Sequence, residues 1–176
     1  FMRWRGKKKI SASEVAETFL GSTRRMLAEC WPDMAQKLSP LVLIPEEQLI
    51  SDEACSHVYL SIISTHYYDL PKLFDPSVTE ALRQGIWYGI TLHDHRPGEF
   101  LMDYIRAMAT ADEQAALSSS VAAAALYENL GGNFIVSDGA TKMASPTATR
   151  ALTELFFLLD LKWWRQLQAE YKVVAV

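Results

Sequence analysis

The sequence predicts an all-α fold. Three observations support this: capping signals at the starts of segments, apolar residues at helical spacing, and very little strand character. We expect one domain over residues 11–176, a bundle of about five to six helices with little or no β structure. A chain of 176 residues is long enough to bury one hydrophobic core. An apolar content of 49% and a charged content of 22% are ordinary for a globular protein.

The first two predicted helices are marked by their starting residues. Ser11 and Glu14 have the spacing of a capping box, which starts a helix that Pro32 is expected to end or kink. A second helix starts near Pro45, because proline suits the first helical position. Apolar and aromatic residues recur along it at helical spacing, together with a histidine near its end: Cys55, Val58, Tyr59, Ile62 and His66.

Three more segments follow in the middle of the chain. Asp75 is a predicted cap for a helix in which Gly85 and Gly89 allow a neighbouring backbone to come close. Residues 99–109 form a fourth helix, and a second capping box at 110–113 is expected to open an alanine-rich helix that Gly131 ends. Residues 133–144 are the least helical part and are predicted to be an ordered loop or a tiny hairpin.

The C-terminal segment is the most apolar part of the chain. Residues 146–171 are predicted to form one long, largely buried helix, with Ser145 as its cap. Its middle, from Leu155 to Trp164, is apolar on nearly every side, whereas a surface helix needs only one apolar stripe. We therefore expect chiefly that this helix lies at the centre of the fold. A surface that binds a partner is its second expected role.

Charge and cysteine content limit the classes of function. Five basic residues lie among residues 1–10, so the net charge of −4 leaves −9 on the rest, that is, −4 less the +5 of this segment. We expect a basic, flexible tail over residues 1–10, with Phe1, which precedes Met2, as a cloning remnant. An acidic body argues against nucleic-acid binding, while Trp4 and the basic residues allow contact with a membrane surface. No apolar core of a secretory signal follows the tail, so we expect a soluble, cytoplasmic protein with Cys30 and Cys55 buried and reduced.

Chemistry-bearing residues are few. His93 and His95 flank Asp94 in a loop and are candidate metal ligands, although a third ligand is not apparent, so we expect no metal and no cofactor. A solvated loop in which Asp94 or His95 caps a helix is the alternative. His57 follows Glu53 by four residues, which is typical of an exposed helical pair.

Asp160 interrupts the most apolar run. It either faces water, pairs with an arginine such as Arg150 or Arg106, or is a functional acid in an aromatic pocket. The function hypothesis that we place first is protein–protein interaction or self-association through the C-terminal helix, with Phe157, Trp163 and Trp164 as anchors. The alternative is a small-molecule-binding or enzymatic bundle with an aromatic-lined pocket.

Overall fold

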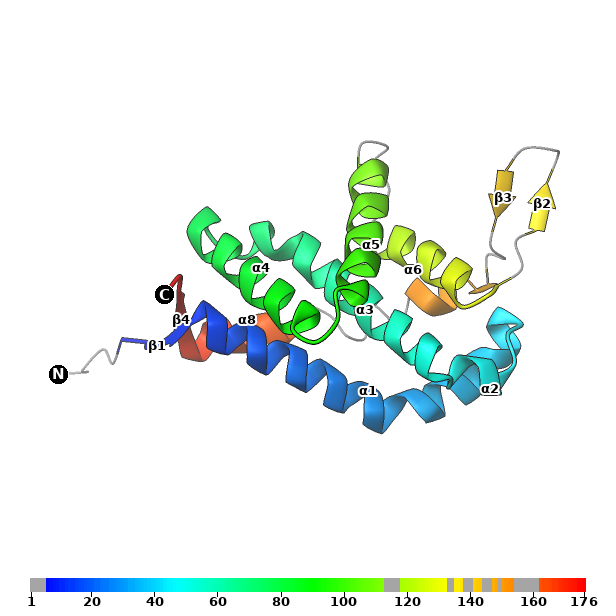
Figure 1. The fold of residues 1–176 in the computed structure, drawn as a ribbon, viewed down its shortest axis with the longest axis horizontal. Helices are drawn as coiled ribbons and strands as arrows, with labels where there is room; N and C mark the ends of the chain where they lie inside the picture. The colour runs from blue at the N-terminus through cyan, green and yellow to red at the C-terminus, as the bar shows by residue number, and fades with distance from the viewer. Residues whose placement is uncertain are drawn as a thin grey trace.

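The computed structural model describes residues 6–112, 118–132, 135–137, 141–143, 147–148, 150–153 and 162–176. The fold is mainly helical, which confirms the predicted class (Figure 1). The helices that the structure describes from end to end are α1 (Ala12–Val42), α2 (Glu46–Leu49), α3 (Asp52–Asp69), the 3-10 helix η1 (Leu70–Lys72), α4 (Pro76–Thr91), α5 (Arg96–Asp112), α6 (Ser118–Asn129) and α8 (Lys162–Glu170). The strands are β1 (Lys8–Ser11), β2 (Ile135–Ser137), β3 (Thr141–Met143) and β4 (Tyr171–Val174).

Helix α1 begins as predicted and is longer than predicted. The backbone N–H of Glu14 donates to Ser11 Oγ (3.2 Å), and Glu14 Oε2 accepts from the Ser11 N–H (3.1 Å), so the capping box is formed. Pro32 does not end the helix, which runs on through Pro40 to Val42. The apolar face of α1 continues past Pro32 with buried residues at helical spacing, and burial of that face offsets the lost backbone hydrogen bonds.

Helix α4 packs closely against α1, as the two glycines predicted. A Cβ atom at Gly85 would lie 2.8 Å from the Cβ of Ala16, and one at Gly89 would overlap Leu20. The side chains that face α1 from α4 are Val78, Leu82, Ile86 and Ile90, all of them buried. Asp75 caps α4 by accepting from the N–H groups of Ser77 and Val78.

Helix α3, rather than the C-terminal helix, is the central element of the described fold. It packs against α1, α5 and α6 (Figure 1). Its buried residues include polar ones, namely His57, Ser61, Ser64 and His66. The two serines donate within the helix, from Ser61 Oγ to the Val58 carbonyl (2.8 Å) and from Ser64 Oγ to the Ser61 carbonyl (2.7 Å). Small polar side chains can therefore be buried here without leaving their donors unpaired.

The prediction of one long, buried C-terminal helix is wrong. Helix α8 has nine residues and ends at Glu170, and of its side chains only that of Trp164 is buried. The next four residues form β4, because Tyr171, Val173 and Val174 favour a strand once a partner strand is present. Leu155–Leu161, which made the segment look apolar all round and which includes Phe157 and Asp160, lies outside the described residues.

The partner of β4 is β1, so the two ends of the described chain lie side by side (Figure 1). The strands are parallel, with Lys8 opposite Tyr171 and Ser11 opposite Val174. Residues 8–10, which were predicted to be part of a flexible tail, are therefore held in a short sheet. Ile10 packs against the core and Val173 is buried, which gives this strand pair an apolar face.

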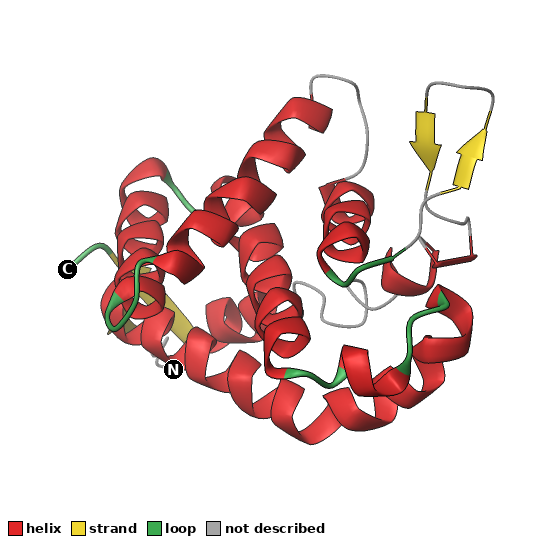
Figure 2. Ribbon diagram, turned by 45° about the vertical axis from the view of Figure 1, so that its right-hand side comes forward, coloured by secondary structure: helices red, strands yellow, loops and turns green. Residues whose placement is uncertain are grey.

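A second strand pair confirms the predicted hairpin. Strands β2 and β3 are antiparallel, with Ile135 opposite Met143 and Ser137 opposite Thr141, and they stand away from the helices in two views (Figures 1 and 2). Gly131 has a φ of 80° and ends α6 as the predicted glycine cap. Within the described ranges, no helix is long and apolar enough to cross a bilayer.

Trp164 joins α8 to three other parts of the fold. Its side chain is fully buried, and its ring centroid lies 4.8 Å from that of Phe19 on α1 and 5.7 Å from that of Phe74. Its Nε1–H donates to Nδ1 of His66 on α3 (3.0 Å). One side chain thus links α1, α3 and the segment before α4 to the C-terminal helix.

We expect Trp164→Phe to lower the free energy of unfolding by about 2–4 kcal/mol, because it removes a buried ring and the donor to His66. Trp163→Phe is the matched control. Trp163 is partly exposed and its indole N–H has no hydrogen bond in the described residues, so its loss is expected to stay below about 1 kcal/mol. Urea unfolding followed by circular dichroism measures both. Equal losses would contradict the special role of Trp164.

Candidate functional site

An apolar pocket lies between α1 and the first turns of α3. It has a volume of about 470 Å³, within the range of small-molecule sites. Leu27, Trp31 and Val58 are its buried apolar residues, and the Nε1–H of Trp31 donates to the Leu49 carbonyl (2.8 Å), which fixes the orientation of the indole. The full lining is Arg24, Leu27, Ala28, Trp31, Pro32, Ile50, Asp52, Cys55, Ser56, Val58 and Tyr59.

The hydroxyl of Tyr59 is the unusual polar group of this pocket. Its oxygen is buried, and the Arg24 side chain is a weak hydrogen-bond partner of it, outside ordinary hydrogen-bond geometry. Burial raises the pKa of the hydroxyl, and the charge and hydrogen bonding of the Arg24 guanidinium, whose Cζ lies 5.3 Å from the centroid of the Tyr59 ring, oppose that rise. The hydroxyl is therefore poorly satisfied within the fold.

Two further polar features lie on the walls of this apolar pocket. Pro32 has no N–H, so the helical hydrogen bond to the carbonyl of Ala28 cannot form, and both residues line the pocket. The Cys55 thiol lies 3.7 Å from the Ile50 carbonyl. Burial, followed by the nearby charge of Asp52, raises the pKa of this thiol. The lining therefore includes a thiol side chain and a proline that interrupts the backbone hydrogen bonds of α1, in an otherwise mainly apolar site.

A second, polar pocket lies on the other side of the start of α3. Its volume is about 380 Å³, and its lining consists of Asp52, Glu53, Ser56, His57, Asp94, Arg96, Pro97 and Phe100. His57 is only 5% exposed, which corrects the prediction that it is half of an exposed pair. The prediction failed because position 57 faces α5, where the His57 ring packs edge-on against Phe100, with centroids 4.7 Å apart.

His57 is held in one tautomer by a chain of buried hydrogen bonds. Asn129 Nδ2 donates to the hydroxyl oxygen of Tyr104 (3.1 Å), and that oxygen lies 3.2 Å from Nδ1 of His57. The Tyr104 side chain is buried, so its hydroxyl proton needs an acceptor, and His57 Nδ1 is the acceptor within reach. The hydroxyl therefore donates to Nδ1, and the ring proton of the neutral imidazole lies on Nε2. No described residue forms a hydrogen bond with Nε2.

The electrostatics of the polar pocket keep His57 uncharged. Burial lowers the pKa of the imidazole, the carboxylate of Glu53 partly opposes this, and the Arg96 guanidinium adds to it. Burial also raises the pKa of the Tyr104 hydroxyl, so that group remains a proton donor. The exposed Asp52 and Glu53 lie in the first turn of α3, where their charges favour the helix.

The two pockets adjoin each other. Asp52 and Ser56 line both, so the apolar and the polar pocket lie on either side of these two residues. The linings differ, because the first pocket is mainly apolar and the second holds His57 among the carboxylates of Asp52, Glu53 and Asp94.

The predicted metal candidates lie at the rim of this region. His93 and His95 are exposed in the loop before α5, and Asp94 accepts from the backbone N–H of Arg96 (3.0 Å), as predicted for a residue that caps the helix start. Among the described residues, no group of three His, Cys, Asp or Glu side chains is placed to hold a metal ion. A metal role for the two histidines stays an untested prediction.

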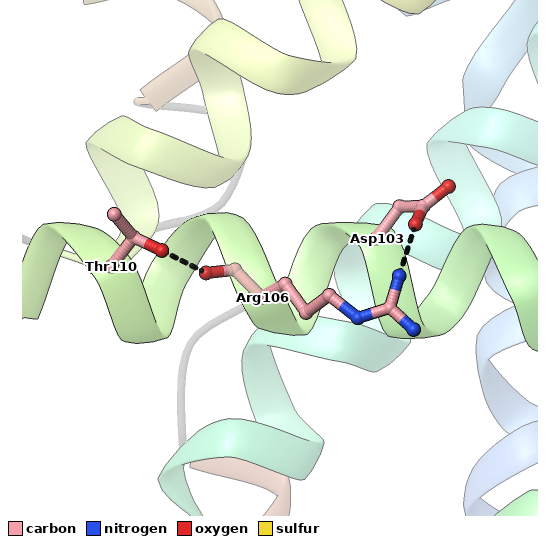
Figure 3. A network of polar contacts seen from close by, with 3 residues as sticks. All are labelled: Asp103, Arg106 and Thr110. Carbon is pink, nitrogen blue, oxygen red and sulfur yellow. Dashed lines mark hydrogen bonds and ion pairs between the residues drawn. The ribbon is translucent and has the colours of Figure 1, made fainter.

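The predicted interaction residues are only partly placed. Trp164 is buried and cannot contact a partner directly, whereas Trp163 is partly exposed and packs on Phe19, with ring centroids 5.4 Å apart. Phe157 and Asp160 lie outside the described residues. Arg106, one predicted partner of Asp160, instead pairs with Asp103 on the exposed face of α5 (2.9 Å, Figure 3).

Figure 3 also corrects the predicted capping box at residues 110–113. Thr110 Oγ1 donates to the carbonyl of Arg106 (3.0 Å) inside α5, which continues to Asp112. The prediction that both cysteines are buried is wrong as well, since Cys30 is exposed and Cys55 is half-buried. Cys30 follows the apolar spacing of α1, but that face turns to solvent at this position.

Searches with this chain find no matching family model, no matching curated protein and no matching solved structure.

Protonation of His57 is expected to destabilise the fold. The pKa of the folded imidazole lies below its ordinary value of 6.5, so the unfolded chain binds the proton more readily. The contribution is present above about pH 6.5 and is lost as the pH falls through the folded pKa. We expect the free energy of unfolding to fall more for the wild type than for His57→Gln between about pH 7.5 and pH 5.5. His93→Gln, at an exposed position, controls for the loss of an imidazole. Parallel pH profiles of wild type and His57→Gln would contradict the expectation.

Proposed function

We propose that this protein binds a small, mainly apolar molecule in the pocket between α1 and α3. The observation that carries the proposal is the pocket itself, which has a ligand-sized volume of about 470 Å³ and includes the buried apolar side chains of Leu27, Trp31 and Val58 in its lining. A pocket of this size with a mainly apolar lining is typical of small-molecule sites.

The lining describes the molecule that would bind. Leu27, Trp31 and Val58 favour an aliphatic or aromatic body, because burying apolar surface is the main gain in such a site. This agrees with the predicted alternative of a small-molecule-binding bundle with an aromatic-lined pocket.

The two cysteines allow a direct test of where such a molecule binds. Cys55 lines the pocket and Cys30 does not, so a bound molecule is expected to slow maleimide labelling of Cys55 several-fold and to leave Cys30 unchanged. The probe is octanol, below the concentration at which it perturbs circular dichroism. Cys30→Ser and Cys55→Ser each leave one thiol to follow by mass spectrometry. Equal protection of both thiols, or of neither, would contradict the proposal.

A substitution that fills the pocket gives a second test. Ala28 lies at the exposed edge of the pocket, so Ala28→Phe is expected to occupy part of the volume and to weaken octanol binding about tenfold or more. Ala109→Phe is the matched control, since Ala109 is also exposed and helical but lies on α5 outside both pockets. Titration calorimetry measures both affinities. Equal weakening by the two variants would place binding elsewhere.

A further inference from the structure

The polar pocket next to the apolar one selects for one kind of chemical group. Three carboxylates line it, those of Asp52, Glu53 and Asp94, against the single guanidinium of Arg96. His57 is buried and neutral, so the lining carries three negative charges and one positive charge, an excess of two negative charges. A cationic group is attracted to such a site, and an anionic one is repelled.

A second observation, independent of the carboxylates, points to a ligand in the same pocket. His57 is only 5% exposed. Its Nε2–H is a hydrogen-bond donor, and no described residue forms a hydrogen bond with this group. Tyr104 and Asn129 fix the opposite nitrogen, so the ring cannot turn that donor away without breaking a buried hydrogen bond. The pocket therefore offers a fixed hydrogen-bond donor to a ligand that carries an acceptor.

We propose that the ligand is an apolar amino alcohol that spans both pockets: its apolar body lies between α1 and α3, and its protonated amine and hydroxyl lie in the pocket of His57. The amine donates to the carboxylates, and the hydroxyl oxygen accepts from His57 Nε2. Asp52 and Ser56, which line both pockets, lie beside the ligand where it crosses. This inference rests on the proposed function and adds the identity of the polar end.

Four probes with the same apolar chain test it: octanol, octylamine, octanoate and N-octylethanolamine, each titrated by calorimetry. We expect octylamine to bind about fivefold tighter than octanol, octanoate to bind no tighter than octanol, and N-octylethanolamine to bind about threefold tighter than octylamine. The advantage of the amine over octanol is expected to shrink as salt is raised, because salt screens partly exposed charges.

The double variant Glu53→Gln/Asp94→Asn locates the amine. It removes two carboxylates of the polar pocket and keeps an amide oxygen to cap α5, so octylamine is expected to lose most of its advantage while octanol binding stays unchanged. Glu170→Gln, at an exposed position of α8 outside both pockets, is the matched control. The salt series on the wild type serves the same purpose if the double variant does not fold.

The outcomes separate the two proposals. If octanol binds and protects Cys55 but octylamine binds no tighter, the amino alcohol is overturned and the apolar site stands. An amine advantage that survives both the double variant and high salt overturns the placement of the amine. If no probe binds, or none protects Cys55, both proposals are overturned.

Discussion

Helix α3 lies between α1, α5 and α6, and its buried polar groups must find their hydrogen bonds inside the protein. The hydrogen-bond partners of these groups determine much of how α3 is held against its neighbours. Ser61 and Ser64 bond to their own helix, His57 reaches Tyr104 on α5 and through it Asn129 on α6, and His66 accepts from Trp164 on α8. The Tyr59 hydroxyl is buried with only a weak hydrogen bond to Arg24, and the Tyr59 side chain lines the apolar pocket.

Local signals in the sequence predicted the elements that depend on local chemistry. The capping box at Ser11, the cap at Asp75, the glycine end at Gly131 and the close approach at Gly85 are each confirmed, because each needs only neighbouring residues or a missing side chain. The prediction of a long, buried C-terminal helix came within one residue of the end of α8 but was wrong about its length and burial, because α8 begins at Lys162 and buries only Trp164. The strand after Glu170 was missed, because its partner β1 lies 163 residues away and leaves no local pattern.

The candidate site was predicted less well than the fold. Cys55 and Tyr59 were placed correctly on one helical stripe. The pocket, however, forms only because α1 and α3 lie side by side, and the sequence does not show which helices are neighbours. His57 looked exposed because its polar partners lie on α5 and α6. The sequence does hold a signal of this network. His57 lies among apolar residues at helical spacing, and Tyr104 and Asn129 lie on later helices, so a polar network that crosses the bundle could have been expected. Self-association through α8 stays a prediction, with Trp163 as its partly exposed ring.

The central claim is that the buried polar groups of α3 differ in how well they are bonded, with the Tyr59 hydroxyl bonded only weakly to Arg24, and the free energy of unfolding of Tyr59→Phe tests it most directly. Removing a weakly bonded buried hydroxyl costs little, so the variant is expected to be as stable as the wild type or more stable by up to about 1 kcal/mol. Tyr104→Phe is the comparison, since it removes a buried hydroxyl with two hydrogen-bond partners and is expected to lose about 1–3 kcal/mol. A loss above about 1 kcal/mol for Tyr59→Phe would mean that the hydroxyl is already well bonded within the fold, and it would contradict the account.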